Sequence, residues 1–243
     1  MTTPQQADSV QGSGFGEMFA GWTALLAIIV FFLAMGPGLH FLPPLSPSLS
    51  ADEFARHYRD HALGARLGSI LMMTGTALLF PLFGAMSAVM MRMKGRPAAL
   101  AWTQMASAVV TFFPLFANSF FFAAAAFRPE RAAEDVLLLS DVGWFWLVMP
   151  TPAALIQLVV FGIAILGDDM ERPLLPRWLA YFNFMVGVLF FSGVFIPLFK
   201  SGPFAWNGLL AFWVPLVVFG IWTPVMAWAF IQLGRRMSRA EPH

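Results

Sequence analysis

The sequence predicts an all-α fold: a polytopic transmembrane helix bundle with six predicted spans and two short amphipathic outer-loop helices. Three observations support this prediction. Hydrophobic residues make up 59% of the 243 residues and charged residues only 11%, which is about half the charge of a typical soluble domain. Several apolar runs reach or approach the roughly 20 residues that cross a bilayer. These runs do not alternate with the two-residue period of a barrel strand, so we expect helices, which satisfy every backbone N–H and C=O within one segment.

The candidate spans form one transmembrane domain, residues 20–234. They cover residues 20–42, 63–91, 98–127, 143–166, 175–200 and 206–233. Helix breakers separate several of them, as in GRP, RPLLP and SGP. Trp102, Trp144 and Trp178 fall close to predicted span ends, where an indole would lie at headgroup depth. We expect residues 1–19 to form a disordered cytoplasmic tail and residues 235–243 a basic cytoplasmic tail.

The distribution of Lys and Arg favours an orientation with both termini in the cytoplasm. In that arrangement eight cations lie inside and six outside, and the short MRMKGR loop and the RRMSR tail both lie inside. Lys and Arg residues near the ends of spans favour the cytoplasmic side of the membrane. We therefore predict a multi-pass protein of a bacterial-type inner membrane.

Each of the two larger outer loops carries a helix signal. Ser50 and Glu53 have the spacing of a capping box, so a helix is expected to begin near Ala51. In the second loop, residues 128–141, Pro129 suits a first helical turn and acidic residues oppose the positive end of the helix dipole. Both segments are expected to form short caps over the bundle.

The RHYRDH stretch in the first outer loop allows two interpretations that involve its histidines. His57 and His61 are one helical turn apart and Asp60 is adjacent, a spacing that permits two or three metal ligands. The stretch can equally be the hydrated start of a membrane helix, with pairs of opposite charge along it. No cofactor is otherwise expected.

A third interpretation of this stretch concerns its arginines. Arg56, Arg59 and Arg66 form a basic collar beside the start of the second span. Because a guanidinium binds phosphate with two parallel hydrogen bonds, this collar could hold an anionic headgroup or substrate.

Deep polar residues of the second and third spans fall on narrow helical faces. In the third span, four polar residues lie within 60° on a wheel of about 100° per residue. In one interpretation, the polar residues of both spans form hydrogen bonds with neighbouring helices. In the other, they line a ligand cavity. The candidate cavity residues are Ser69, Thr76, Gln104, Ser107, Thr111 and Asn118.

The composition and motifs argue against several function classes. The net charge of +1 argues against a nucleic-acid partner, and no P-loop, GxSxG, HExxH or dinucleotide motif occurs. The middle of each predicted span lacks ionisable residues, which argues against a proton pump. An enzyme is therefore the less favoured class.

Three functional hypotheses follow from the sequence. The leading one is a binding or transport component for an apolar or amphipathic small molecule or a membrane lipid, held between spans two, three and five. The second is an accessory or assembly subunit that uses its apolar surface to contact another membrane protein or a further copy of itself. The third is a metal-dependent membrane enzyme that uses the cluster of His57, Asp60 and His61.

Overall fold

The protein is an all-helical bundle in which six helices are long and apolar enough to span a membrane, as the sequence predicts. The computed structural model describes residues 14–240, and strands are absent from this part of the chain. The spans are α1 (Phe15–Leu33) with η3 (Ala34–Gly38), α3 (Ala62–Ala77) with α4 (Phe80–Arg92), α5 (Ala98–Phe127), α6 (Ala133–Val148) with α7 (Thr151–Leu166), α8 (Arg177–Phe190) with η4 (Phe191–Leu198), and η5 (Leu209–Trp213) with α9 (Val214–Ala240).

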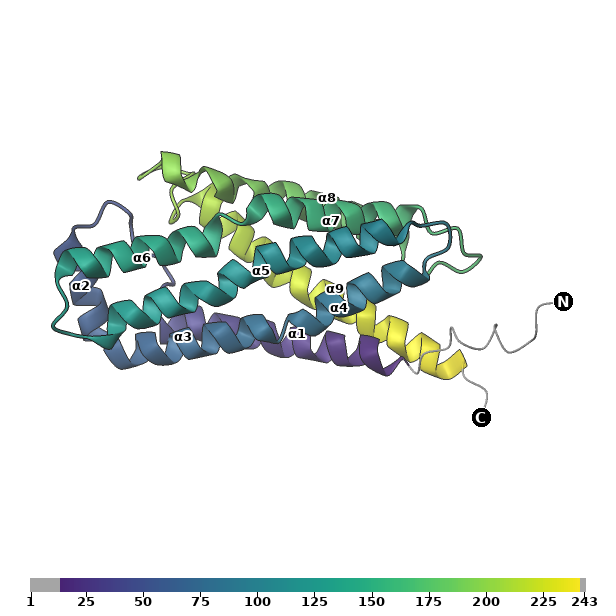
Figure 1. Ribbon diagram of the computed structural model, residues 1–243, viewed down its shortest axis with the longest axis horizontal. Coiled ribbons are helices and arrows are strands. Elements are labelled where there is room, and N and C mark those ends of the chain that lie inside the picture. The colour runs from purple at the N-terminus through teal and green to yellow at the C-terminus, as the bar shows by residue number, and fades with distance from the viewer. Residues whose placement is uncertain (1–13, 241–243) are drawn as a thin grey trace.

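The spans run along the long axis of the molecule (Figure 1). Helix α5 packs against α3, α6 and α7, while α1 packs against α9 and α3. Helix α8 packs mainly on α7 and makes a smaller contact with α9. Large hydrophobic side chains face outward along every span. This exposed apolar surface is the expected one for a bundle surrounded by lipid.

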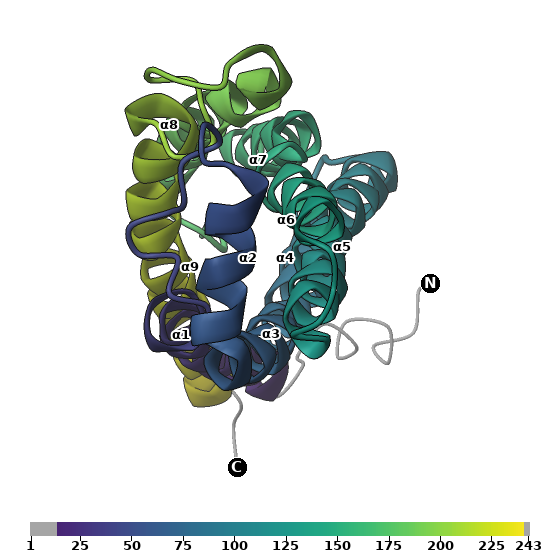
Figure 2. The ribbon, with the colours of Figure 1, turned by 90° about the vertical axis from the view of Figure 1, so that its left-hand side faces the viewer.

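Helix α2 (Ala51–Asp60) lies across one end of the bundle, beside α6 and near the start of α3 (Figure 2). Its capping box is present as predicted. The Ser50 backbone N–H donates to Glu53 Oε2 at 2.7 Å, and the Glu53 backbone N–H donates to Ser50 Oγ at 3.4 Å. Phe54 and Tyr58 are buried, so α2 turns its apolar face onto the bundle.

The second outer-loop segment differs from the expected short helix. Residues from Ala133 onward form α6, the first half of the fourth span, which therefore begins ten residues before the predicted boundary at 143. No breaker interrupts the helix until Met149 and Pro150, which separate α6 from α7. Trp144, expected at headgroup depth, is consequently fully buried inside the bundle.

The ends of the domain also differ from the expected tails. Helix α1 starts at Phe15, so residues 15–19 are helical, and residues 1–13 lie outside the described residues. Helix α9 continues to Ala240, so the basic segment from residue 235 extends the last span as a helix. Residues 241–243 lie outside the described part of the chain.

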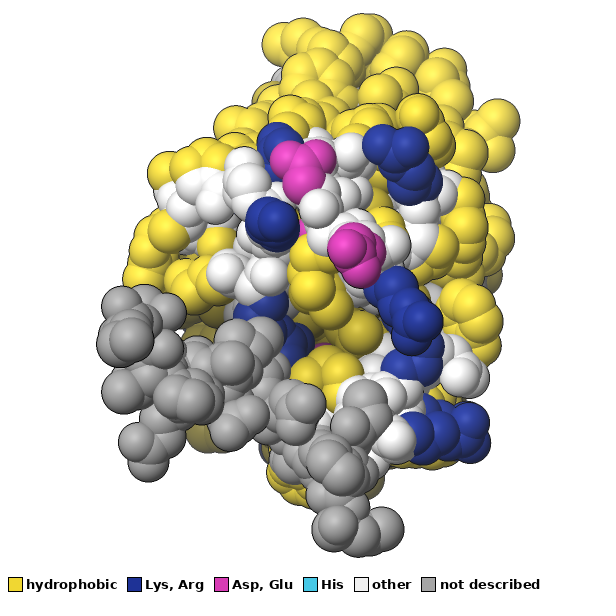
Figure 3. All heavy atoms as spheres, turned by 90° about the vertical axis from the view of Figure 1, so that its right-hand side faces the viewer, with side chains coloured by type: hydrophobic (Ala, Val, Ile, Leu, Met, Phe, Trp, Pro, Cys, Tyr) yellow, Lys and Arg dark blue, Asp and Glu magenta, His cyan; other side chains and the backbone are white. Residues whose placement is uncertain are grey.

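The two ends of the bundle differ in charge. Eight of the fourteen Lys and Arg residues lie at the end formed by the 93–97 loop, the 167–176 loop and the last turns of α9. Figure 3 shows these cations spread over that end with few acidic groups among them. This is the end that the distribution of cations predicts to be cytoplasmic, and its orientation in a membrane stays a prediction.

Candidate functional site

An apolar cavity of the described chain lies where several spans are interrupted. It has a volume of about 130 Å³ and touches spans one, three, four, five and six, whereas span two contributes none of the described lining. It is lined by Phe31, Met35, Thr111, Phe112, Leu115, Leu147, Val148, Pro150, Thr151, Ala154, Phe190, Ala211, Phe212, Pro215, Leu216 and Phe219.

Helix interruptions border this space. Pro150 separates α6 from α7, and Pro215 follows the π-helical turn η5 at the start of α9. A proline removes a backbone N–H and displaces the preceding turn. Interrupted helices at membrane depth are tolerated where they line a cavity or are buried in protein. Both prolines belong to the lining.

The lining is almost entirely apolar. Of its sixteen described residues, five are Phe and only Thr111 and Thr151 carry hydroxyl groups. Thr111 Oγ1 donates to the Ser107 carbonyl oxygen at 2.8 Å, and Thr151 Oγ1 donates to the Phe191 carbonyl oxygen at 3.4 Å. Each hydroxyl has therefore used its proton, and its oxygen can only accept a further bond. The side chains of the lining therefore offer two hydrogen-bond acceptors and no free donor within an apolar surface.

The size of the cavity sets the size of the guest. Apolar cavities of about 150 Å³ in other proteins stay free of water and bind benzene or xenon. This cavity has a similar volume, about 130 Å³, but it is open on one side rather than enclosed. Its volume corresponds to a single aromatic ring or a short stretch of an acyl chain.

Of the six predicted cavity residues, the structure places only Thr111 in the lining. Ser69 and Thr76 are buried and donate to carbonyl oxygens four residues earlier in α3, at 2.7 and 2.8 Å. Gln104 bonds to the hydroxyl of Ser87 across the α4–α5 contact.

The remaining two predicted cavity residues, Ser107 and Asn118, lie on α5 and are not part of the cavity lining. Ser107 is half-buried, and its carbonyl oxygen holds the hydroxyl of Thr111. Asn118 is fully buried: its Oδ1 accepts from Ser119 Oγ at 3.4 Å, while its Nδ2 has no hydrogen-bond partner among the described residues. A ligand-binding role for these residues stays a prediction.

The outer arginines are exposed, and two of them bond to the backbone. Arg59 Nε donates to the Pro129 carbonyl oxygen at 3.0 Å, which ties α2 to the loop before α6. Arg66 Nε donates to the Ala62 carbonyl oxygen at 3.1 Å, within its own helix. Arg56 is exposed on α2. A headgroup-binding role for the three stays a prediction.

The histidines of α2 pack together with His40. The ring centroids of His40 and His61 are 4.1 Å apart, and those of His57 and His61 are 4.8 Å apart. His57 Nε2 lies 3.1 Å from the Leu39 carbonyl oxygen and His61 Nδ1 lies 2.9 Å from the His57 carbonyl oxygen. Because a carbonyl only accepts, these two nitrogens carry protons and cannot bind a metal as they stand. Among residues 14–240, no group of three His, Cys, Asp or Glu side chains is arranged to hold a metal ion. Asp60 therefore does not complete a metal site with the histidines.

Burial and local bonding shift two pKa values in α2. Burial lowers the pKa of His57, and the neighbouring charges of His61 and His40 lower it further, against the raising effects of the Leu39 carbonyl and Asp60. The backbone and side-chain hydrogen bonds from Ser50 lower the pKa of Glu53. Both shifts favour a neutral His57 and an ionised Glu53 at neutral pH.

The sequence contains one signal that points to the cavity. The cavity requires Phe31 and Met35 from span one and Ala211 to Phe219 from span six, which helical-wheel patterns of polar residues do not select. The prolines within the apolar runs, such as Pro150 and Pro215, do mark positions where a helix must change course.

The chain matches no known protein-family model, no curated protein and no solved structure.

Proposed function

We propose that this multi-pass helical membrane protein is a binding or transport component for an apolar small molecule or the acyl chain of a lipid. The cavity among the interrupted spans is the observation that supports the proposal, because it combines a volume of about 130 Å³ with an apolar lining rich in Phe. Cavities at interrupted helices are a recurring location for ligands in membrane proteins.

The lining also indicates a route for the guest. Phe190 and Leu216 are only half-buried, whereas Phe112 and Ala211 are buried. The cavity thus reaches from the interior of the bundle toward its lipid-facing surface. An apolar guest dissolved in the bilayer would enter from the side without crossing the polar ends.

Filling the cavity provides the test. Ala154 and Ala211 are buried lining residues, so Ala154→Phe and Ala211→Phe each place a phenyl ring in the space that the guest would occupy. Ala106→Phe is the matched control, because Ala106 is exposed on α5 and is not part of the lining. All variants are purified in the same detergent.

Toluene serves as the probe and the melting temperature as the measurement. A ligand that binds only the folded state at ten times its Kd stabilises it by about 1.4 kcal/mol. We expect toluene to raise the melting temperature of the wild type and of Ala106→Phe by a few degrees, and not that of the filled variants. Mass spectrometry of an organic extract then identifies any apolar compound that copurifies with the wild type. Equal responses of all four proteins, with no copurifying compound, would exclude the proposal.

A further inference from the structure

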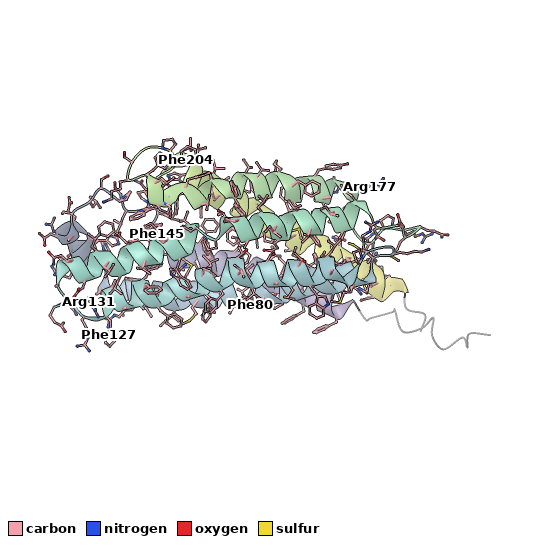
Figure 4. The ribbon with its side chains drawn as sticks, turned by 45° about the horizontal axis from the view of Figure 1, so that its top comes forward. Phe80, Phe127, Arg131, Phe145, Arg177 and Phe204 are labelled. Atoms are coloured by element: carbon pink, nitrogen blue, oxygen red, sulfur yellow. The ribbon has the colours of Figure 1, made fainter. Side chains whose placement is uncertain are left out.

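A second concave site lies between the start of α8 and the last turns of α9, at the cation-rich end of the bundle. This α8–α9 groove is lined by Arg177, Trp178, Trp228, Gln232 and Arg236, together with prolines of the preceding loop. Figure 4 shows Arg177 at the end of the bundle opposite Phe127 and Arg131. The groove is separate from the apolar cavity and shares no residue with it.

The two arginines of the groove are held in place by backbone carbonyls at the end of α7 and in the loop between α7 and α8. Arg177 Nη2 donates to the Leu166 carbonyl oxygen at 3.3 Å, and Arg236 Nη2 donates to the Leu174 carbonyl oxygen at 2.6 Å. A guanidinium carries five N–H donors, so each arginine keeps most of its donors for another partner. Both side chains are therefore held in position while most of their N–H donors stay available for a ligand.

Three acidic residues at this end have other partners, and a fourth, Glu171, is exposed and does not line the groove. Glu17 pairs with Arg92, and Asp169 pairs with Arg96 at 3.8 Å. The carboxylate of Asp168 accepts from the backbone N–H groups of Lys94, Met170 and Leu174. Within residues 14–240, neither groove arginine forms an ion pair. The groove thus presents positive charge that no carboxylate of the described residues pairs with.

Two indoles form the other side of the groove. Trp178 and Trp228 are 47% and 52% exposed, and their ring centroids are 6.4 Å apart. Exposed Trp side chains near the ends of spans lie at the level of the lipid headgroups, with the ring toward the acyl chains. Positive charge and apolar surface therefore meet in one groove at the depth where a phospholipid has its phosphate and glycerol.

We propose that the α8–α9 groove binds an anionic phospholipid, with the headgroup phosphate between Arg177 and Arg236 and the upper acyl chains against Trp178 and Trp228. Basic sites between membrane helices on the cytoplasmic side bind anionic headgroups in this way. The two indoles favour a lipid over a soluble anion, because an inorganic phosphate would leave them exposed. This inference does not depend on a guest in the apolar cavity.

Native mass spectrometry of the purified protein tests the proposal with two lipids of the same acyl chains, palmitoyl-oleoyl phosphatidylglycerol and palmitoyl-oleoyl phosphatidylcholine. We expect the wild type to bind phosphatidylglycerol more tightly than phosphatidylcholine. Removing both charges in Arg177→Gln/Arg236→Gln should weaken phosphatidylglycerol binding about tenfold or more, since hydrogen bonds between charged groups are the strong ones. Arg177→Lys/Arg236→Lys keeps the charge without the two-pronged donor geometry. Its affinity for phosphatidylglycerol should lie between that of the wild type and that of the double Gln variant.

Arg235→Gln is the matched control, because Arg235 precedes Arg236 on α9, is exposed, and does not line the groove. It removes one positive charge from the same end and should leave the lipid preference unchanged. A melting temperature within about a degree of the wild type shows that each variant is folded. Excess inorganic phosphate should not displace the lipid, and displacement would identify the site as one for a soluble anion. Equal phosphatidylglycerol binding by the double Gln variant and Arg235→Gln would overturn the proposal.

Discussion

The contact between the end of span one and helix α3 depends on a glycine. A Cβ atom on Gly68 would lie 2.6 Å from the Leu39 backbone nitrogen and 2.7 Å from the Gly38 carbonyl carbon. Both atoms belong to the backbone, so neither can rotate away as a flexible side chain would. The two segments would have to separate by most of an ångström to restore ordinary contact. Gly68→Ala should therefore destabilise the protein.

The size of the effect follows from two opposing terms. Inserting a methyl group into a well-packed contact costs about 1–3 kcal/mol, whereas alanine is better than glycine in a helix interior by up to about 1 kcal/mol. Gly68→Ala is thus expected to lower the free energy of unfolding by about 1–2 kcal/mol. A Cβ atom on Gly84, in α4 of the same span, would have no other atom of the described chain within 4 Å beyond its own surroundings in the helix. Gly84→Ala therefore gains the helix preference of alanine without a steric cost, and its free energy of unfolding should equal or slightly exceed that of the wild type.

Equilibrium unfolding measures this difference. Both variants and the wild type are titrated with sodium dodecyl sulfate in dodecyl maltoside micelles, and the loss of structure is followed by circular dichroism. The expected order of stability is Gly84→Ala at or above the wild type, and Gly68→Ala below it. If Gly68→Ala were as stable as Gly84→Ala, the close approach of the Gly38–Leu39 segment to α3 would be refuted.

Two further predictions concern a half-buried histidine and a buried amide. The pKa of His57 is lowered in the folded protein, so as the pH falls the unfolded chain binds a proton near pH 6.5 before the folded protein does. The stability of the wild type should therefore fall as the pH drops below 6.5. The melting temperature of His57→Gln should decline less steeply over the same range. A profile for the variant that parallels the wild type would contradict this assignment. Asn118 Nδ2 has no partner among the described residues, and a buried donor left unpaired costs about 1–3 kcal/mol. Asn118→Leu should therefore raise the melting temperature, and a fall would reveal a partner for the amide.

The apolar runs predicted the six spans, but the sequence misplaced the start of the fourth. The acidic residues between 128 and 141 suggested an outer loop with its own short helix, whereas α6 begins at Ala133 and continues to Val148. Charge indicates contact with water and does not by itself end a helix. Tyr58 on α2 donates to Ser140 Oγ at 3.2 Å, so this outer part of α6 is covered by protein.

The aligned polar residues of the second and third spans show why a helical wheel could not identify the lining of the apolar cavity. Ser69, Thr76 and Thr111 all donate to carbonyl oxygens one turn earlier in their own helices. That carbonyl is available at every helical position, so a deep hydroxyl needs no ligand and no neighbouring helix to be satisfied. Alignment of such residues along a face is compatible with a cavity but does not require one.

The cavity depends on a relation between distant parts of the chain. Pro150 and Pro215 each locate an interruption along one span, and the sequence shows both. A shared cavity forms because packing brings the two interruptions together beside Phe31 and Phe112, which come from spans that are themselves helical at those residues. The depth of a proline within its span is a local property, whereas the neighbour that faces it is set by long-range packing. Because Ala154 and Ala211 line the same space from different spans, a phenyl ring introduced at either position should exclude an apolar guest equally well.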